Sequence, residues 1–198
     1  QQAIQIMLDP ADCGPACISL SQDVQGEVYD YPEEFFKERV HTIRRPRPDD
    51  FQIKEAAELI KKSKKPIIIA GGGVFYSDAT DELSDFAKKH NIPVTQTVMG
   101  YSSLKKDHTH YLGTIGGLGG RAANNLSKET DTAIAIGTKL ADFTTGSWAN
   151  FENPNFKLVS INAARFDANK HMAQAIVGDA KVSLMELSQA LGSWKADD

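Results

Sequence analysis

The sequence is poor in the features that mark membrane-spanning, nucleic-acid-binding and disulfide-bonded proteins. Its 198 residues contain no apolar run near the roughly 20 residues that a membrane span needs. A formal net charge of −4 gives the chain no general attraction for a polyanion, so neither a membrane nor a nucleic acid is an expected partner. The first residues are polar and mixed, unlike a secretory leader, which predicts a cytoplasmic protein.

Cysteine and histidine are also scarce, and their spacing suits neither redox nor metal chemistry. Cys13 and Cys17 are too far apart for a Cys-x-x-Cys motif and lack the second pair of a structural zinc site. His108 and His110 have no third and fourth ligand at a convincing spacing. No nucleophile has an adjacent base, and no two carboxylates are placed to work as a pair. The sequence therefore predicts no metal site and no catalytic residue within this chain.

What the sequence does contain is an alternation of short aliphatic runs with amphipathic segments. Five runs predict strands: residues 67–70, 92–98, 132–136, 157–161 and 175–177. Between and around these runs, apolar residues recur at helical spacing, which predicts four helices. Strands that alternate with helices predict an α/β fold with a doubly wound, mostly parallel, Rossmann-like sheet.

Polar residues ahead of the helical segments predict where the helices begin. Asp49 can cap the first helix, with Gln52 three residues later in the capping-box position. Ser77 or Asp78 is expected to cap the second helix, and Asp179 is expected to cap the last one. The third helix is expected over residues 121–128. The first helix is expected to pack on the sheet through Ile53, Ala56, Ala57 and Ile60.

The first 48 residues do not share this pattern. Residues 16–24 alternate small or apolar with polar side chains after a Gly-Pro turn, which predicts a strand. Residues 26–48 are rich in proline, tyrosine and charge without a sustained period, which predicts a linker. We expect residues 1–25 to be the end of a preceding domain, 26–48 a linker, 49–192 a nucleotide-binding-like domain, and 193–198 the start of a second linker. A chain that starts with Gln1 and Gln2 in the middle of a structural element also reads as an excised fragment.

Three glycine-bearing turns lie beside the aliphatic runs. They are Gly71-Gly72-Gly73, the loop from Gly113 to Gly120 that includes Gly116, Gly117 and Gly119, and Gly137-Thr138-Lys139. Ligands of such sheets bind at the carboxyl ends of strands, where helix N-termini attract phosphate, so we expect a nucleotide-sized cleft there. Five glycines in eight residues favour a pyrophosphate cradle in the second turn. Two alternatives stay open: the first turn only lets strand and helix pack closely, or the second is a mobile interdomain loop.

The ordinary dinucleotide fingerprint is incomplete. Tyr76 stands where G-x-G-x-x-G requires its third glycine, and no acidic residue closes the second predicted strand. In the third turn, Thr138 and Lys139 could meet phosphate or ribose oxygens, and Phe143 or Trp148 could cover a flat ring. Asn162 follows the next strand, where these folds often hold a ribose or adenine edge. A surface loop without a ligand is the alternative for the third turn.

Several segments in order resemble thiamine-diphosphate enzymes of the acetohydroxyacid synthase type. Residues 14–32 and the Arg44-Arg45-Pro46-Arg47-Pro48 run resemble the place where the first domain of that family joins the central one. Gly71–Val74, 113–125 and Gly178-Asp179 resemble the central domain itself. Residues 137–148 and 162–171 resemble the branch of the family that opens a cyclic dione in inositol catabolism.

The resemblance implies a parent enzyme with three α/β domains. The first and third domains would bind thiamine diphosphate and Mg²⁺ outside these 198 residues, so this chain alone is expected to be inactive. The expected partners are the missing domains and other copies of the parent, in a dimer or tetramer. A carboligase of the acetolactate synthase kind, a free-standing nucleotide-binding module and a purely structural domain are the alternatives.

The resemblance also bears on the candidate cleft. Relatives use the central domain to hold FAD or an ADP-like group, and by position Asp179 joins the candidate contacts. Lys139-Leu140-Ala141-Asp142 departs from the Arg-Phe-Asp-Asp run of flavin-binding relatives, so NAD or an empty cleft stays open. The candidate contacts are Gly71, Gly72, Gly73, Gly116, Gly117, Gly119, Thr138, Lys139, Asp142, Phe143, Asn162 and Asp179.

Overall fold

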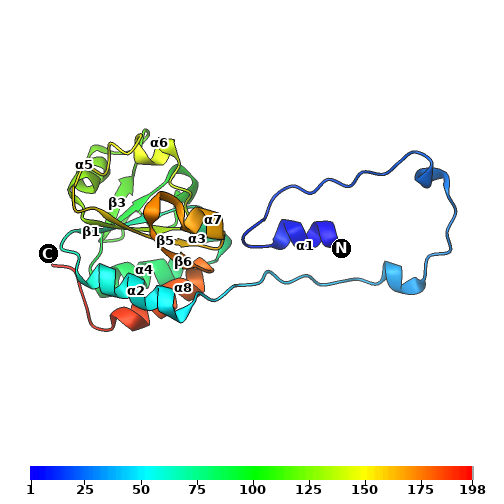
Figure 1. The fold of residues 1–198 in the computed structure, drawn as a ribbon, viewed down its shortest axis with the longest axis horizontal. Helices are drawn as coiled ribbons and strands as arrows, with labels where there is room; N and C mark the ends of the chain where they lie inside the picture. The colour runs from blue at the N-terminus through cyan, green and yellow to red at the C-terminus, as the bar shows by residue number, and fades with distance from the viewer. Residues whose placement is uncertain (198) are drawn as a thin grey trace. The chain divides into compact units, whose positions relative to one another are not determined.

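The computed structural model describes residues 1–197, which divide between Arg44 and Arg45 into two units (Figure 1). The first unit holds α1 (Gln2–Leu8) and two 3-10 turns, η1 (Val24–Gly26) and η2 (Glu33–Phe36). None of its described residues is buried. The strand predicted over residues 16–24 is wrong, because a strand needs a neighbour to complete its hydrogen-bond ladder and the described part of this unit offers none.

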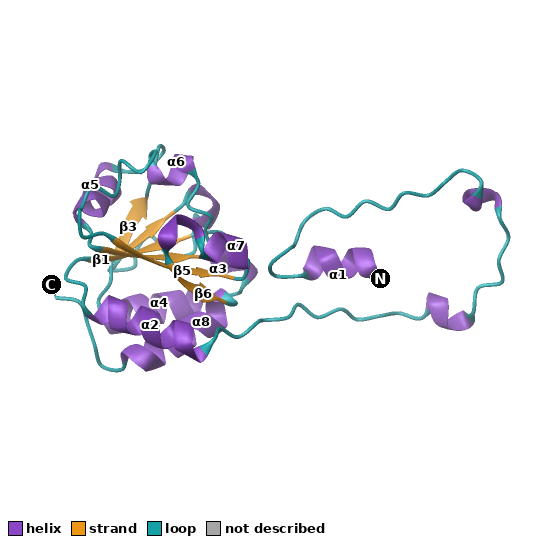
Figure 2. Cartoon of the chain, viewed as in Figure 1, coloured by secondary structure: helices purple, strands orange, loops and turns teal. Residues whose placement is uncertain are grey.

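The second unit is built on one six-stranded parallel sheet (Figure 2). Its strands are β1 (Pro66–Ala70), β2 (Val94–Gln96), β3 (Tyr111–Thr114), β4 (Thr132–Ile136), β5 (Lys157–Asn162) and β6 (Gln174–Val177). They lie in the order β3-β2-β1-β4-β5-β6, and each neighbouring pair is parallel. The predicted α/β, doubly wound architecture is confirmed.

Burial on both faces of the sheet explains why its central strands are almost wholly aliphatic. Successive side chains of a strand point to opposite faces. In β1, Ile68 and Ala70 join the larger apolar cluster, whereas Ile67 and Ile69 join a smaller cluster on the other face. All four residues are fully buried. Apolar residues at every position, rather than at alternate ones, are what a parallel sheet with two covered faces requires.

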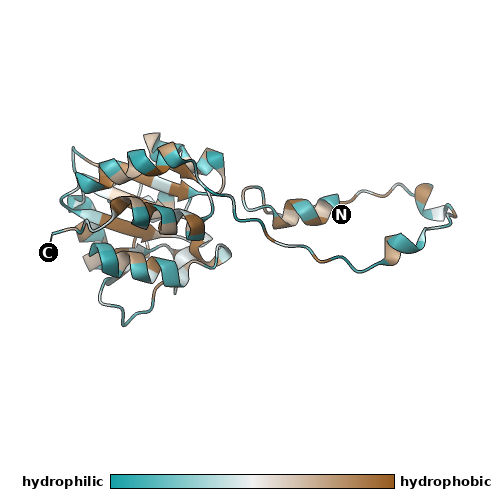
Figure 3. Cartoon of the chain, turned by 90° about the horizontal axis from the view of Figure 1, so that it is seen from below, coloured by the Kyte–Doolittle hydropathy of each residue, from teal (hydrophilic) through white to brown (hydrophobic). Residues whose placement is uncertain are grey.

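Three helices cover the face of the larger cluster: α2 (Asp50–Lys61), α4 (Thr80–His90) and α8 (Ala180–Leu191). Figure 1 shows them side by side, and in Figure 3 their outward sides are mostly hydrophilic while the strands are hydrophobic. The predicted stripe of α2 is confirmed, since Ile53, Ala56, Ala57 and Ile60 are buried. Leu126 of α5 (Arg121–Glu129) packs against the smaller cluster on the opposite face.

The helix starts agree with the predicted caps in two cases of three. Asp49 accepts a hydrogen bond from the Phe51 N–H at 2.8 Å, and Asp179 caps α8. The predicted capping box is wrong, because Gln52 Oε1 instead accepts from the Val177 N–H at the end of β6, at 2.8 Å. Ser77 and Asp78 do not cap α4, because a separate turn, α3 (Gly73–Tyr76), comes first.

One strand was not predicted. β3 pairs in parallel with β2, at the outer side of the sheet, and all four of its residues are half-buried. Its sequence, Tyr-Leu-Gly-Thr, contains a glycine with φ of +96° at Gly113. A short edge strand with a glycine lacks the aliphatic run by which the other strands were recognised.

Candidate functional site

The strand order places two of the three glycine turns together. The sheet order reverses between β1 and β4, and in open α/β sheets the crevice for a ligand lies at this switch point, outside the carboxyl ends of the strands. Gly71–Gly73 follows β1, and Gly137–Lys139 follows β4. We call the segments at the carboxyl ends of β1 to β5 the carboxyl rim: residues 71–76, 97–101, 115–120, 137–148 and 163–168.

Close packing between the two turns accounts for their glycines. A Cβ on Gly71 would lie 2.3 Å from the Gly137 carbonyl oxygen, and one on Gly73 would lie 2.5 Å from the Gly137 Cα. The Gly73 N–H donates to the Gly137 carbonyl at 2.9 Å. Gly137 itself has φ of +58°, a conformation that favours glycine. The backbones meet without space for any side chain.

The second turn packs in the same manner against α6 (Asp142–Thr145). A Cβ on Gly116, where φ is +97°, would lie 2.4 Å from the Phe143 carbonyl oxygen. The Gly117 N–H donates to that same oxygen at 2.9 Å, and the Gly116 N–H donates to Asn124 Oδ1 at 2.9 Å. Gly119 and Gly120 donate to carbonyls of their own loop. These N–H groups have protein acceptors, so a pyrophosphate cradle in this loop stays a prediction.

A small charged group lies beside the third turn. Asp167, in α7 (Arg165–Ala168), has one carboxylate oxygen 2.6 Å from Lys170 Nζ and the other 3.9 Å from Lys139 Nζ. Asn162 donates to the Thr138 carbonyl at 3.4 Å, and its Oδ1 accepts from the Ala164 N–H at 3.0 Å. Two ammonium groups around one carboxylate leave a net positive charge. Lys170 was not among the predicted residues, because nothing in the sequence links it to the β4 turn.

The Asp179 carboxylate is bound by protein groups other than those of the charged group around Asp167. Asp179 is only 3% exposed, and its Oδ1 accepts from the Lys181 and Val182 N–H groups at 3.0 and 3.3 Å. Its Oδ2 is 3.1 Å from Arg45 Nη1, which also donates to the Ser77 carbonyl. The oxygens of Asp179 therefore cap α8 and bind Arg45. Nucleotide contacts from Asp179, from the exposed Asp142 and from the Phe143 ring stay predictions.

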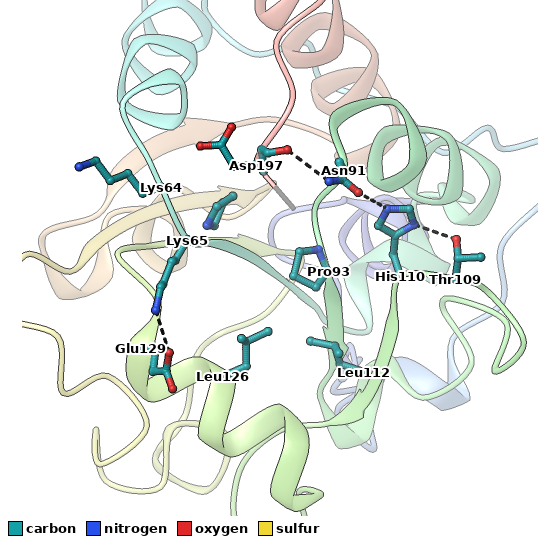
Figure 4. A pocket seen from close by; sticks show the side chains of 12 residues that line it. Lys64, Lys65, Asn91, Pro93, Thr109, His110, Leu112, Leu126, Glu129 and Asp197 are labelled. Atoms are coloured by element: carbon teal, nitrogen blue, oxygen red, sulfur yellow. Dashed lines mark hydrogen bonds and ion pairs between the residues drawn. The ribbon is translucent and has the colours of Figure 1, made fainter.

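The hollow of about 560 Å³ in Figure 4 lies at the other end of the strands. We call this end the amino rim, where β1, β2 and β3 begin. Leu112 and Leu126 face each other across it, and Lys65 Nζ pairs with Glu129 Oε2 at 2.8 Å. The hollow contains none of the predicted site residues. Its residues come from segments without a recognisable motif.

Histidines beside this hollow have lowered pKa values. Burial is the main cause for both His108 and His110, and the Lys88 ammonium lowers each pKa further. Their rings lie 5.5 Å apart, and His110 Nε2 is 3.1 Å from Asn91 Oδ1. Among the described residues, no three histidine, cysteine or acidic side chains form a group that could hold a metal ion.

The fold and the switch-point turns define the class of protein. A six-stranded parallel sheet in this order, with glycine turns at the reversal, is a doubly wound, Rossmann-like domain. A family model, described as "Thiamine pyrophosphate enzyme, central domain", matches residues 53–187. The chain belongs to this family, and the resemblance drawn from the sequence is confirmed.

Relatives with a named activity match nearly the whole chain. It is 48% identical over 189 residues to a 3D-(3,5/4)-trihydroxycyclohexane-1,2-dione hydrolase of Clostridium perfringens, and 44% identical over 196 residues to one of Bacillus licheniformis. The matches cover 96% and 99% of this chain but 30% and 31% of those proteins. The chain therefore spans less than a third of the length of these curated relatives.

A solved structure shares the fold. A protein from Mycobacterium smegmatis, provisionally described as a thiamin diphosphate-dependent enzyme, matches with a TM-score of 0.73 and 22% identity. The match covers 100% of this chain and 37% of that chain. In the part of the chain that the structure describes, no helix has the length and apolar character needed to cross a membrane.

Proposed function

We propose that this chain is the central domain of a longer thiamine-diphosphate-dependent hydrolase. That enzyme would cleave a carbon–carbon bond of 3D-(3,5/4)-trihydroxycyclohexane-1,2-dione and release 5-deoxyglucuronate in inositol catabolism. The observation that carries the proposal is 48% identity across 96% of the chain to a hydrolase of that name. Identity spread over a whole domain indicates a shared role for the domain more strongly than any single motif does.

The described residues do not fit Mg²⁺. They contain no group of three metal-binding side chains, and the polar group at the carboxyl rim is cationic, which repels a metal ion. We therefore assign Mg²⁺, and with it the thiamine diphosphate that the resemblance places in the same two domains, to the flanking regions of the longer protein, and we expect this chain alone to be inactive. The other partners in the proposal are further copies of that protein, as a dimer or tetramer, in the cytoplasm.

The reaction product distinguishes the proposal from an acetolactate synthase-like carboligase. The test is a chimera in which this chain replaces the matching region of the Clostridium perfringens relative. If the chain comes from the hydrolase, the chimera should form 5-deoxyglucuronate from the cyclic dione when thiamine diphosphate and Mg²⁺ are present. Acetolactate formed from pyruvate, with no turnover of the dione, would support the carboligase instead.

A nucleotide at the switch point is the second part of the proposal, with FAD, an ADP-like group or NAD as candidates. The strand order and the net positive charge around Asp167 support it. Because N–H groups of the 113–120 loop already have protein acceptors, we assign the phosphate to Lys139 and Lys170. In a calorimetric titration with each nucleotide, Lys139→Ala should weaken binding about tenfold, as loss of one charge-assisted contact does.

A matched control is available at the other rim. Lys65→Ala removes a lysine of the amino rim, far along the strands from the switch point, and should leave the nucleotide affinity unchanged. Equal affinity of the parent and the Lys139→Ala variant would rule out the assigned phosphate contact. If none of the three nucleotides gives a heat signal, the domain is a spacer that binds no nucleotide.

A further inference from the structure

The exposed lysines of the second unit gather at the amino rim. The segments there are residues 193–197 and those that lead into β1 to β5, which are 58–65, 88–93, 105–110, 126–131 and 152–157. The C-terminal segment joins the others because the Ala196 N–H donates to the His90 carbonyl at 2.9 Å. Eleven of the fifteen lysines of the second unit lie in these segments, and all eleven are exposed: Lys61, Lys62, Lys64, Lys65, Lys88, Lys89, Lys105, Lys106, Lys128, Lys157 and Lys195.

The amino rim has a surplus of positive charge. The eleven lysines stand against six acidic residues in the described segments, which are Glu58, Asp107, Glu129, Asp131, Glu152 and Asp197. The surplus is therefore five positive charges, although the whole chain has a formal net charge of −4. Three of the eleven lysines form ion pairs with described residues, namely Lys61, Lys65 and Lys128. The charges of the other eight are available to a partner.

Helix ends account for five of the eleven lysines. These five lie in the last turn or at the C-cap of α2, α4 or α5: Lys61, Lys62, Lys88, Lys89 and Lys128. A positive charge at such a place is favoured by the negative end of the helix dipole. The other six lie beyond the helix ends, in connecting segments or, for Lys157, at the first position of β5. Their charges complement no helix end and need a different explanation.

The hollow of about 560 Å³ lies among these lysines. Its lining residues come from the segments before β1, β2 and β3 and from the end of α5, and they include Lys64 and Lys65. The half-buried side chains of Leu112 and Leu126 face each other across the hollow (Figure 4). Its volume is within the range of roughly 300–1,000 Å³ of ordinary ligand pockets. The rim therefore combines an apolar depression with cationic surroundings.

The composition of the rim favours carboxylates over nucleic acid. None of the four arginines of the second unit lies in the described rim segments, and none of its exposed large hydrophobic side chains does. Nucleic-acid surfaces use arginine for bidentate phosphate contacts and aromatic rings for base stacking. Lysine has a flexible stem and three rotatable donors, which suit carboxylates that approach from different directions.

We propose that the amino rim binds an acidic segment of a separate polypeptide, with an aliphatic side chain of that segment in the hollow. The carboxylates of the partner lie along the lysines, and the hollow fixes its register. The starts of β3, β2, β1, β4 and β5 form a row of about 19 Å at the usual strand spacing. An extended segment of about six residues spans that row. The interface is independent of the reaction that the longer protein performs.

Two acidic peptides test both parts of this surface. One peptide has six glutamates around a central leucine, and the other has serine in place of the leucine. In calorimetric titration the 198-residue chain should bind the leucine peptide at least about tenfold more tightly, because the hollow removes the leucine side chain from water. Both affinities should fall in high salt, which screens exposed charges. Equal affinities, or no binding of either peptide, would overturn the proposal.

A reversal of one lysine charge has a matched control. Lys64→Glu places a negative charge at the rim and should weaken binding of the leucine peptide about fivefold. Lys54→Glu changes another exposed lysine, which lies on α2 about 10 Å along the axis from the end of that helix, and should leave the affinity unchanged. Equal weakening by both substitutions would show attraction to net charge alone and would contradict a site at the rim.

Two further measurements separate other occupants from the proposed one. A twelve-nucleotide RNA that binds more tightly than the leucine peptide would make the rim a nucleic-acid surface. The folded chimera should bind the leucine peptide as the 198-residue chain does, and loss of binding in the chimera would show that a flanking region already covers the rim. Either result would overturn the proposal, whatever the rate at which the chimera converts the dione.

Discussion

The two rims of the sheet differ in how they use their backbone and side chains. At the carboxyl rim, glycines bring the turns into direct contact, and apolar side chains stand in solvent. At the amino rim, a hollow of about 560 Å³ is lined by two leucines, a lysine–glutamate pair and His110. In this sequence, closely spaced glycines therefore mark places where turns contact one another, whereas the hollow forms among residues without a recognisable motif.

The largest expected effect comes from breaking the contact at the carboxyl rim. Gly71→Ala places a Cβ 2.3 Å from the Gly137 carbonyl, so the backbone must move, and we expect a loss of about 2–3 kcal/mol of unfolding free energy. Gly72→Ala is the matched control, because its Cβ would lie 3.2 Å from the nearest atom. Urea unfolding of both variants measures the difference. Equal losses would contradict the role assigned to Gly71.

Removal of the Asp179 side chain should have the next largest effect. Asp179→Ala removes the acceptor of the Lys181 and Val182 N–H groups and the carboxylate partner of Arg45, which keeps only the Ser77 carbonyl, and we expect a loss of about 2 kcal/mol. Asp49→Ala removes a cap with one hydrogen bond, to the Phe51 N–H, and should cost about half as much. Thermal unfolding of the two variants compares the caps. A larger loss for Asp49→Ala would overturn this ranking.

At the amino rim, a buried histidine should make stability depend on pH. His90 is fully buried, with Nδ1 2.8 Å from the Trp194 carbonyl and Nε2 3.1 Å from Ser188 Oγ. Burial lowers the pKa of His90 below its ordinary value of 6.5. The unfolded chain therefore binds the proton more readily, and stability should be full above pH 6.5 and fall as the pH drops below it.

His90→Gln removes this titrating group and should flatten the stability profile below pH 6.5. Some dependence should remain, since burial also lowers the pKa values of His108 and His110. His41→Gln, in the exposed first unit, is the control and should keep the parent profile. The unfolding free energy of the parent, the His90→Gln variant and the His41→Gln variant is measured at several pH values. A His90→Gln profile equal to that of the parent would show that His90 does not cause the pH dependence.

The smallest effect is expected from the charged pair at the amino rim. Lys65 and Glu129 are both well exposed, at 58% and 62% of their side chains, so water and salt screen their attraction. Lys65→Met should leave the unfolding midpoint unchanged in both low and high salt. A midpoint that falls clearly, and only at low salt, would show that the amino rim depends on this pair more than its exposure indicates.

The sequence predicted those parts of the fold that a single segment encodes. Buried strands such as β1 and β4 have continuous aliphatic runs, and Asp179 caps α8 as expected. β3 was missed because it is short, half-buried and interrupted by Gly113. Gln52 was assigned to its own helix because its partner, Val177, lies 125 positions away in the chain.

The candidate site was predictable in place but not in detail. The rule for parallel sheets put the glycine turns at the carboxyl rim, and the strand order set Gly71 beside Gly137. The sequence could not show that Phe143 and Asn124 supply acceptors to the 113–120 loop, or that Lys170 approaches Asp167 beside Lys139. These contacts join segments whose distance is fixed only by the packed sheet.

We propose that this chain serves as the middle domain of a thiamine-diphosphate-dependent dione hydrolase. The most direct test is the rate at which the chimera with the Clostridium perfringens relative converts the cyclic dione, measured with thiamine diphosphate and Mg²⁺. Hydrolysis of the dione to 5-deoxyglucuronate is the expected result. A chimera that folds, assembles and binds thiamine diphosphate, yet leaves the dione intact, would contradict it.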